Sequence, residues 1–444
     1  MYVLYSAALA VALVLAAPFW AYRAMRHGKY RAGFGERWGR IPARLGLPLA
    51  GGSIWVHAVS VGEVLAVSGL VQELRARFPE RRVLISTITT TGQKLAAERF
   101  GPENVFYFPL DFAFAVRAWL RALRPEMVVL AETEFWPNFL RLAKAGGARI
   151  AVVNGRISDR SWPRYRRFRG LMQPVLDNVD LFLAQSEEDR RRLVEIGAAA
   201  ERVQVSGNLK FDAKPPGSVP LADELRAAMA RSGAGPVLVC GSTVEGEESM
   251  LLRAFKAVLE RYPRTMMLLA PRHPERFEQV AGLLAASGVR FQRRSQWSAA
   301  SEVAGSVFLL DSIGELASTY ALAQVAFIGG SLVARGGHNV LEPAYYGAAI
   351  LVGPHTENFR DTISLFRKAN ALRVVTPDEL APAFLQLLED DRQRQGMGRR
   401  ATDLLRAQSG ATARTLAALD AFLNRQPAAE ALRAGDAVSP RLGA

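Results

Sequence analysis

The segment that decides the fold reads Phe327-Ile-Gly-Gly-Ser-Leu-Val-Ala-Arg-Gly-Gly-His-Asn-Val-Leu-Glu342-Pro. Its apolar start predicts a buried parallel strand over Val325–Ile328, and a helix is expected to begin near Asn339. Glycines at a strand-to-helix junction let the backbone approach a ligand closely, and the free N–H groups of a helix N-terminus favour a phosphate. Glu342, one turn into that helix, is placed to accept hydrogen bonds from ribose hydroxyls. The segment suits a nucleotide, although a glycine-rich turn without a ligand is the alternative.

The same pattern of strand followed by helix repeats along the chain. Continuous apolar strands separated by helical stretches predict an α/β protein with parallel sheets covered on both faces. The chain has 444 residues, which favours two domains. The predicted strands are Ile54–Val59, Val83–Ser86, Met127–Ala131, Ile150–Val153, Leu181–Ala184 and Val203–Val205 in the first half, and Val237–Cys240, Met266–Ala270, Val307–Leu310, Val325–Ile328, Ile350–Val352 and Leu372–Val375 in the second.

The predicted organisation is two facing doubly wound, Rossmann-like domains preceded by one helix. Ligands of such domains bind at the carboxyl ends of the strands. Pro- and Gly-rich stretches on either side of a short helix mark the linker region. The boundaries are 1–22 for a membrane anchor, 23–211 for the first domain, 212–235 for the linker region, 236–425 for a nucleotide-binding domain, and 426–444 for a loose tail.

The anchor is predicted from an apolar N-terminus followed by basic residues. Residues 1–22 carry no charged side chain, and the run Val3–Trp20 is almost wholly apolar. A run of this length is just sufficient to cross a hydrocarbon core of ~30 Å. A cleavable signal peptide would carry its positive charge before the apolar run, whereas here the arginines follow it. The positive-inside rule then predicts a single-pass anchor with the remaining chain in the cytoplasm; a helix that lies in the membrane interface is the alternative.

Composition narrows the partners and the chemistry. The net charge of +14 implies a polyanionic partner, which could be nucleic acid, an anionic membrane or a phosphorylated substrate. A single cysteine, Cys240, excludes intramolecular disulfides. The glycine-rich segment matches neither GxGxxG nor GxxxxGK[ST], so dinucleotide oxidoreductases and P-loop NTPases are disfavoured. The five histidines show no HxxxH or HExxH spacing, and we expect neither a metal site nor a cofactor.

Four further motifs stand directly after predicted strands or beside them. They are His57-Ala-Val-Ser-Val-Gly-Glu63, Ala131-Glu-Thr-Glu-Phe-Trp-Pro-Asn138, Pro271-Arg-His-Pro-Glu-Arg-Phe277 and Gly353-Pro-His-Thr-Glu-Asn358. With the glycine-rich segment they resemble, in order, the signature set of the 3-deoxy-D-manno-octulosonic acid (Kdo) transferases of Gram-negative lipopolysaccharide synthesis. The resemblance implies the two-domain glycosyltransferase-B fold and an inverting transfer of Kdo from cytidine monophosphate Kdo (CMP-Kdo) to a phosphorylated lipid A precursor, lipid IVA, in inner-core synthesis.

The first domain carries the expected catalytic residues. Glu63 follows a glycine at a helix start, where a carboxylate can act as general base, although an acidic residue there can also merely compensate the helix N-terminus. The resemblance implies the base role for Glu63 and stabilising roles for Glu132 and Lys210. Glu132 and Glu134 are two residues apart, so only one is expected to face the ligand, and Glu134 is a candidate partner for a basic residue. A solvated linker lysine is the alternative for Lys210.

The second domain carries the expected nucleotide site. Arg272 follows a strand and is suited to a bidentate grip on one phosphate. A helix is expected to start at Ile313-Gly-Glu315, with main-chain groups available to a cytosine base. The family often has proline where this chain has Val340. The predicted donor-binding residues are Pro271, Arg272, Ile313, Gly314, Glu315, Asn339, Val340, Leu341 and Glu342.

A second basic cluster lies in the first domain, over residues 156–169. Arginines interleaved with Trp162, Tyr165 and Phe168 could bind single-stranded nucleic acid, an anionic lipid interface, or only solvent. The anchor favours lipid, so the expected partners are CMP-Kdo, the lipid A precursor and anionic inner-membrane lipids, without nucleic acid. The rival functions are a nucleotide-sugar 2-epimerase of the same fold and a non-enzymatic protein that binds anionic membranes.

Overall fold

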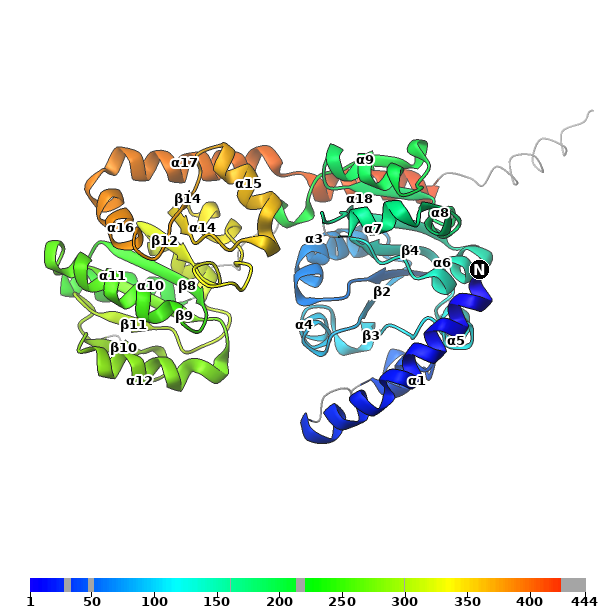
Figure 1. Cartoon of the computed structure of the whole chain (residues 1–444), viewed down its shortest axis with the longest axis horizontal. Helices are drawn as coiled ribbons and strands as arrows, with labels where there is room; N and C mark the ends of the chain where they lie inside the picture. The colour runs from blue at the N-terminus through cyan, green and yellow to red at the C-terminus, as the bar shows by residue number, and fades with distance from the viewer. Residues whose placement is uncertain (28–32, 47–51, 160, 213–219, 299, 425–444) are drawn as a thin grey trace, which may run out of the picture. The chain divides into compact units, whose positions relative to one another are not determined.

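A computed structural model describes residues 1–27, 33–46, 52–159, 161–212, 220–298 and 300–424, with the side chains of 18–27 left out. The chain forms two compact units, Met1–Ala213 with Ser409–Ala444, and Lys214–Gln408. Each unit contains one sheet with helices on both of its faces (Figure 1). The core of the predicted linker, 213–219, and the predicted tail, 426–444, lie outside the described residues.

The first unit is built on a seven-stranded parallel sheet. Its strands follow the order β3 (Val105–Tyr107), β2 (Arg82–Thr87), β1 (Ser53–His57), β4 (Pro125–Ala131), β5 (Arg149–Gly155), β6 (Leu181–Ala184) and β7 (Val203–Val205). Its helices are α1 (Tyr2–His27), α2 (Phe34–Arg37), α3 (Val61–Arg77), α4 (Thr90–Phe100), α5 (Ala113–Leu123), α6 (Pro137–Ala145), α7 (Trp162–Arg167), α8 (Arg169–Leu176), α9 (Glu187–Glu195) and α18 (Ala411–Asn424).

Both faces of this sheet are buried, as the continuous apolar strands predict. In β1 the side chains of Ile54 and Val56 join one apolar core and Trp55 joins the other. Successive side chains of a strand point to opposite faces, so a strand covered on both sides must be apolar at every position. This sandwich holds the carboxyl ends of the strands, where the motifs lie, in fixed register.

The second unit repeats the architecture with another seven-stranded parallel sheet. Its strands follow the order β10 (Phe291–Arg293), β11 (Val307–Leu309), β9 (Met266–Pro271), β8 (Val237–Thr243), β12 (Val325–Ile328), β13 (Ala349–Val352) and β14 (Arg373–Val374). Its helices are α10 (Pro220–Ser232), α11 (Glu247–Arg261), α12 (Phe277–Ser287), α13 (Leu316–Thr319), α14 (Leu341–Tyr345), α15 (Arg360–Lys368), α16 (Leu380–Glu389) and α17 (Asp391–Gln408). Cys240 is fully buried in β8, and burial raises the pKa of its thiol.

The predicted second domain extends too far at its C-terminus, because α18 belongs to the first unit. Leu419 of α18 is fully buried in the core that contains α3. Asp212 accepts hydrogen bonds from Gly410 and Thr412 at the start of the helix, and the Arg414 guanidinium donates to the Ser206 carbonyl. The chain therefore returns to the first unit after Gln408.

The predicted anchor forms part of the single long helix α1, one side of which contacts the first unit. The Tyr2 hydroxyl donates to the Pro174 carbonyl at 3.3 Å, and the Asn138 amide donates to Ser6 Oγ at 2.9 Å. Within the part of the chain that the structure describes, we find no helix long and apolar enough to cross a membrane. The prediction of a membrane-spanning anchor is therefore not supported.

Candidate active site

Glu63 lies in the first turn of α3, directly after β1. Its carboxylate accepts hydrogen bonds from the Val59 N–H at 2.8 Å and the Ser60 hydroxyl at 2.9 Å. Ser60 in turn caps the helix by accepting the Glu63 N–H, which is the reciprocal capping box. Partial burial raises the pKa of Glu63 to about 7, and the charge of Glu132 contributes in the same direction. The Glu63 carboxylate therefore stabilises the first turn of α3. The same carboxyl group can also exchange a proton near neutral pH.

Glu132 and Lys210 form an ion pair at the carboxyl edge of the same sheet. Lys210 Nζ lies 3.0 Å from Glu132 Oε1, and both side chains are partly exposed. Glu132 follows β4, the neighbour of β1, and its backbone is left-handed with φ of 59°. Left-handed backbone is costly for a residue with a Cβ. The structure thus brings Glu63, Glu132 and Lys210 together at one edge of the sheet, and their catalytic roles stay predictions.

Two further residues lie close to this group. Asn154, also left-handed at φ 53°, accepts the Leu209 N–H at 3.0 Å and so holds the 3₁₀ turn η4 (Leu209–Asp212) that carries Lys210. Glu134 accepts a hydrogen bond from the Trp136 indole at 2.9 Å. The hydrogen-bond partner of Glu134 is thus an indole N–H, and its pairing with a basic residue stays a prediction.

In the second unit, the predicted phosphate and ribose residues influence one another. Asn339 contacts Glu342 at 3.4 Å through its side-chain amide. Burial raises the pKa of Glu342, while Asn339 and the charge of Arg272 lower it. Burial and the charge of Arg272 lower the pKa of His338 to about 4, so His338 is neutral at pH 7. Arg272 itself is exposed after Pro271, the last residue of β9.

The predicted helix start near Asn339 is two residues early. Helix α14 runs only from Leu341 to Tyr345, and Val340 is its N-cap. Val340 is fully buried and Leu341 is nearly so. Their side chains therefore pack the core, and only their main-chain groups are available to a ligand.

The loop after β11 exposes one apolar side chain, and its acidic side chains bind residues of the same unit. Ile313 is 69% exposed, and Gly314 has φ of 92°. The carboxylate of Glu315 pairs with the Arg294 guanidinium at 3.1 Å and accepts the Ser312 hydroxyl. Glu315 is thus not free to bind a base through its side chain, which leaves main-chain groups and Ile313 for that role.

Two buried carboxylates in this unit were missed by the sequence analysis. Glu247 accepts N–H groups of the glycine-rich turn, including Gly330 at 2.7 Å. Glu248 accepts both terminal nitrogens of Arg276, at 2.6 and 3.0 Å. Acidic residues in a first helical turn commonly only offset the helix dipole, so their sequence position gives no warning. The available signal was the glycine-bounded stretch Gly241-Ser-Thr-Val-Glu-Gly-Glu-Glu248 directly after a strand.

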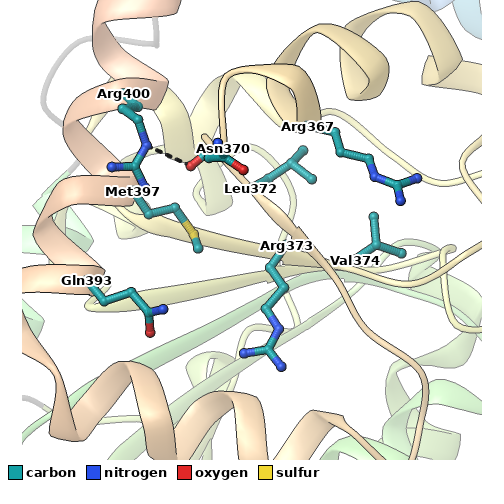
Figure 2. Close-up of a pocket in the computed structure, with 8 residues that line it drawn as sticks. All are labelled: Arg367, Asn370, Leu372, Arg373, Val374, Gln393, Met397 and Arg400. Carbon is teal, nitrogen blue, oxygen red and sulfur yellow. Dashed lines mark hydrogen bonds between the residues drawn. The ribbon is translucent and has the colours of Figure 1, made fainter.

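Metal-ligand groups and pockets would be further candidates for a binding site. Among the described residues, no group of three or more His, Cys, Asp or Glu side chains could hold a metal ion. A pocket of about 600 Å³ lies beside the edge strand β14. Figure 2 shows Arg367, Arg373, Arg400 and Met397 among the residues that line it. None of the predicted donor-binding residues lines it.

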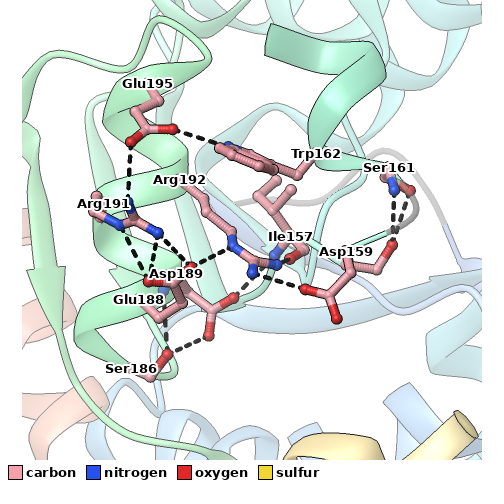
Figure 3. A network of polar contacts seen from close by, with 11 residues as sticks. Ile157, Asp159, Ser161, Trp162, Ser186, Glu188, Asp189, Arg191, Arg192 and Glu195 are labelled. Carbon is pink, nitrogen blue, oxygen red and sulfur yellow. Dashed lines mark hydrogen bonds and ion pairs between the residues drawn. The ribbon is translucent and has the colours of Figure 1, made fainter.

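Within the basic cluster predicted over 156–169, residues 162–169 form helix α7 and the start of α8, and Arg160 lies outside the described residues. Figure 3 shows how a polar network joins its start to α9. Arg192 pairs with Asp159 at 2.7 Å and donates to the Ile157 carbonyl at 2.8 Å. The Trp162 indole donates to Glu195 at 3.0 Å. Beyond this attachment, the exposed residues include Arg164, Arg166, Arg167, Phe168, Arg169 and Leu171.

Two parallel sheets, each with polar groups at its carboxyl edge, define a two-domain α/β fold. The overall fold is similar to a putative UDP-N-acetylglucosamine 2-epimerase from Listeria monocytogenes, with a TM-score of 0.57, 15% identity, and coverage of 84% of this chain and 97% of that chain. It is also similar to a glycosyltransferase from Rickettsia africae, with a TM-score of 0.53, 10% identity, and coverage of 85% and 100%. These likenesses show the fold alone, and they include both an epimerase and a transferase.

The sequence comparisons decide between the two activities. Residues 32–213 match the family model of 3-deoxy-D-manno-octulosonic-acid transferase (kdotransferase). The chain is 33% identical to such a transferase from Haemophilus influenzae over 89% of this chain and 93% of the relative. It is 37% identical to one from Bordetella pertussis over 91% and 95%. The chain belongs to the 3-deoxy-D-manno-octulosonic acid transferase family and is a glycosyltransferase.

Proposed function

We propose that this chain transfers Kdo from CMP-Kdo to a phosphorylated lipid A precursor at an anionic membrane, in inner-core lipopolysaccharide synthesis. The observation that carries the proposal is the group at the edge of the first sheet. There burial and the charge of Glu132 raise the pKa of Glu63 to about 7, and Glu132 itself pairs with Lys210. A general base works best when its pKa lies near the working pH.

The reaction assigned to this group is a single displacement with inversion. Glu63 takes the proton of an acceptor hydroxyl, and the hydroxyl oxygen forms the new bond to the anomeric carbon of Kdo. The bond from that carbon to the phosphate oxygen breaks, and its electron pair leaves with cytidine monophosphate. We assign to Lys210 the role of offsetting the carboxylate of Kdo or the leaving phosphate, and its hydrogen bond to Glu132 orients its side chain.

The donor is assigned to the second unit. Arg272 supplies the positive charge for the single phosphate, and Glu342 accepts hydrogen bonds from the ribose. The main chain at Ile313 and Gly314 is left for the cytosine, because the Glu315 carboxylate is held by Arg294. One phosphate can be neutralised by an arginine without a divalent cation, so we expect the reaction to need no metal.

The acceptor is assigned to the membrane, and α1 supports this assignment. The helix contacts the unit through Tyr2 and Ser6. Elsewhere along its length Val3, Leu4 and Leu15 are between 76% and 82% exposed. A helix with an exposed apolar side lies favourably in the membrane interface. We therefore assign α1 to the interface, as an attachment that does not cross the bilayer.

The surface of α7 and α8 supplies a second contact with anionic lipid. Exposed arginines lie beside Phe168 and Leu171, which are 50% and 59% exposed. The guanidinium groups of Arg164 and Arg166 lie over the rings of Tyr165 and Trp162. Aromatic rings favour the headgroup level and arginines favour phosphates, so this surface suits an anionic membrane.

One assay tests the proposal against its rivals. The purified chain is incubated with CMP-Kdo and lipid IVA in vesicles, and release of cytidine monophosphate is measured together with the mass of the lipid. We expect release that requires the lipid, with the lipid gaining the mass of Kdo. Lipid-independent conversion of a uridine diphosphate sugar would instead identify an epimerase. Vesicle binding without turnover of either donor would identify a non-enzymatic membrane-binding protein.

A further inference from the structure

The last residues of β8 and the loops after β12 and β13 pack backbone against backbone at the carboxyl edge of the second sheet. A Cβ added to Gly329 would lie 2.4 Å from the Ser242 carbonyl oxygen, and one added to Gly353 would lie 2.1 Å from the Ser331 carbonyl oxygen. Both distances are too short for any side chain, so these glycines are required by packing. The closeness of the loops leaves little freedom for the glycine-rich turn to move alone.

The N–H groups of that turn converge on the carboxylate of Glu247. Glu247 Oε2 accepts the Gly330 N–H at 2.7 Å, and Oε1 accepts the N–H groups of Ser331 and Leu332 at 2.9 Å each. The Val244 N–H, from the turn before α11, adds a fourth bond at 3.0 Å. Successive backbone N–H groups of this kind form a nest that binds anions. Here the anion is the chain's own carboxylate, which is fully buried.

This occupancy corrects the prediction for the first part of the glycine-rich segment. The glycines of this segment were expected to let the backbone approach a ligand closely, but the N–H groups at 330–332 are already bonded to Glu247. The donor phosphate must therefore rely on groups outside this nest, such as Arg272.

The adjacent carboxylate, that of Glu248, contacts the residues around the loop that carries Arg272. Glu248 binds the guanidinium of Arg276 and accepts the Thr243 hydroxyl at 3.0 Å. The Arg272 N–H donates to the Thr243 carbonyl at 2.9 Å. Two neighbouring acids on one turn thus hold two different loops, one leading to Asn339 and Glu342 and the other carrying Arg272.

We propose that Glu247 is a positioning residue of the donor site, which binds the nest of the glycine-rich turn as an internal substitute for a phosphate. By fixing residues 330–332 it sets the path of the chain into His338, Asn339 and Glu342. The inference rests on the proposed assignment of the donor to this unit. It assigns to Glu247 no contact with the substrate.

The test uses the full chain and cytidine monophosphate as the probe, with affinity measured by calorimetry. In Glu247→Gln the amide NH₂ cannot accept hydrogen bonds, so at least one N–H of the nest loses its partner. We expect the affinity for cytidine monophosphate to fall about 10-fold or more, with a smaller change in kcat than in the donor KM. Glu245→Gln is the matched control, because Glu245 is exposed on the same turn. Unchanged affinity in Glu247→Gln would overturn the proposal.

Rescue by a small anion separates positioning from general destabilisation. Glu247→Ala leaves the nest without its carboxylate, and formate at ~100 mM is small enough to enter it. Formate should restore the affinity of Glu247→Ala for cytidine monophosphate, whereas chloride at equal ionic strength should not. If Glu247→Ala does not fold, the Gln variant decides the question alone. A folded Glu247→Ala variant that formate leaves unchanged contradicts the proposal.

Hydrogen exchange tests the positioning role of Glu247 separately from the proposed donor. Amide exchange of the peptide that contains residues 330–332 needs no ligand. It should speed up in Glu247→Ala and slow again with formate. If the parent chain does not bind cytidine monophosphate, the proposed donor is wrong, while exchange still reports whether Glu247 fixes the turn. Exchange that is equal in parent and variant removes the positioning role, whatever the donor is.

Discussion

At the scale of single residues, Glu63 has a structural and a chemical role in the same carboxyl group. Its hydrogen bonds to Val59 and Ser60 close the first turn of α3. In Glu63→Gln the amide oxygen can still accept the Val59 N–H, but no proton acceptor remains. We expect turnover to fall by ~10²-fold or more at an unchanged or higher melting temperature above pH 7. Turnover within a few-fold of the parent would remove Glu63 from the base role.

The pH dependence of activity follows from the raised pKa of Glu63. Partial burial and the charge of Glu132 move this pKa from 4.5 to about 7, and the base must be ionised to work. We expect kcat/KM to rise with pH up to about 7 and then level off. The stability effect has the opposite sign. The folded chain holds this proton more tightly than the unfolded chain does. The contribution of Glu63 to the free energy of unfolding therefore falls as the pH rises from 4.5 to about 7. Rate profiles and thermal melts over pH 5–9 check both, and the Gln variant should lack both effects.

Glu342 gives a test of the ribose assignment. Glu342→Ala removes an acceptor that acts equally on the ground state and the transition state, so it should raise the donor KM more than it lowers kcat. We expect about a 10-fold loss of affinity for cytidine monophosphate. The comparison with deoxycytidine monophosphate is the control, because the variant should lose its preference for the ribonucleotide. An unchanged affinity would exclude Glu342 from the ribose site.

Motif positions were predictable from the sequence at this scale, but hydrogen-bond partners were not. Glu63, Glu132 and Lys210 were each placed by a motif near a strand end, and the structure links them through charge and an ion pair. Glu134 was a candidate partner for a basic residue, and nothing in the sequence indicates that it accepts a hydrogen bond from the Trp136 indole. Glu247 was missed because its partners are N–H groups more than 80 residues later in the chain, which local sequence cannot specify.

At the scale of elements, the interior strands of both sheets and two of the four edge strands, β7 and β14, were predictable. The interior strands are present within a few residues of their predicted bounds, because a strand covered on both faces must be apolar throughout. The two missed strands, β3 and β10, have three residues each and lie at the edges of their sheets. The membership of α18 was also missed, since it depends on contacts with Asp212 and the α3 core rather than on its own sequence.

The loop after β11 offers a test at the element scale. Residues 293–295 hold both of its acids, with Arg294 paired to Glu315 and Arg293 paired to Asp311 at 2.8 Å. If this loop binds the base, Arg294→Ser should free Glu315 and weaken cytidine monophosphate binding by about 3- to 10-fold. A partly exposed ion pair contributes only about 1 kcal/mol or less to stability, so the melting temperature should barely change. The reversed pair, Arg294→Glu with Glu315→Arg, should recover part of the affinity, and equal binding in all variants would remove the loop from the base site.

At the scale of the whole molecule, the net charge of +14 can favour membrane binding in two ways, through overall attraction or through a specific basic surface. A basic protein associates with any anionic surface at low salt. The first unit also carries features of a specific membrane contact, namely the exposed apolar side of α1 and the arginine–aromatic surface of α7 and α8. A test of specific membrane contact must therefore compare the removal of equal charge from different places on the molecule.

The last prediction compares two triple variants of equal charge. One replaces Arg164, Arg166 and Arg167 by serine. The other replaces three exposed arginines of the second unit, Arg253, Arg392 and Arg399. Each basic residue close to an anionic surface contributes about 1 kcal/mol, so the first variant should lose roughly 10²-fold in partition onto anionic vesicles at low salt. The second should lose much less, because its charges lie in the other unit.

Salt and α1 supply the remaining controls. The difference between the two triple variants should shrink as ionic strength rises, since the Debye length falls from about 10 Å at 0.1 M to about 3 Å at 1 M. Binding that persists at high salt should be lost on changing Leu4, Val11 and Leu15 of α1 to glutamine, because these exposed side chains contribute through apolar burial, which salt does not screen. Both triple variants should retain the parent's affinity for cytidine monophosphate. If they bind vesicles equally, the α7–α8 arginines are solvated surface, and the lipid acceptor reaches Glu63 by another route.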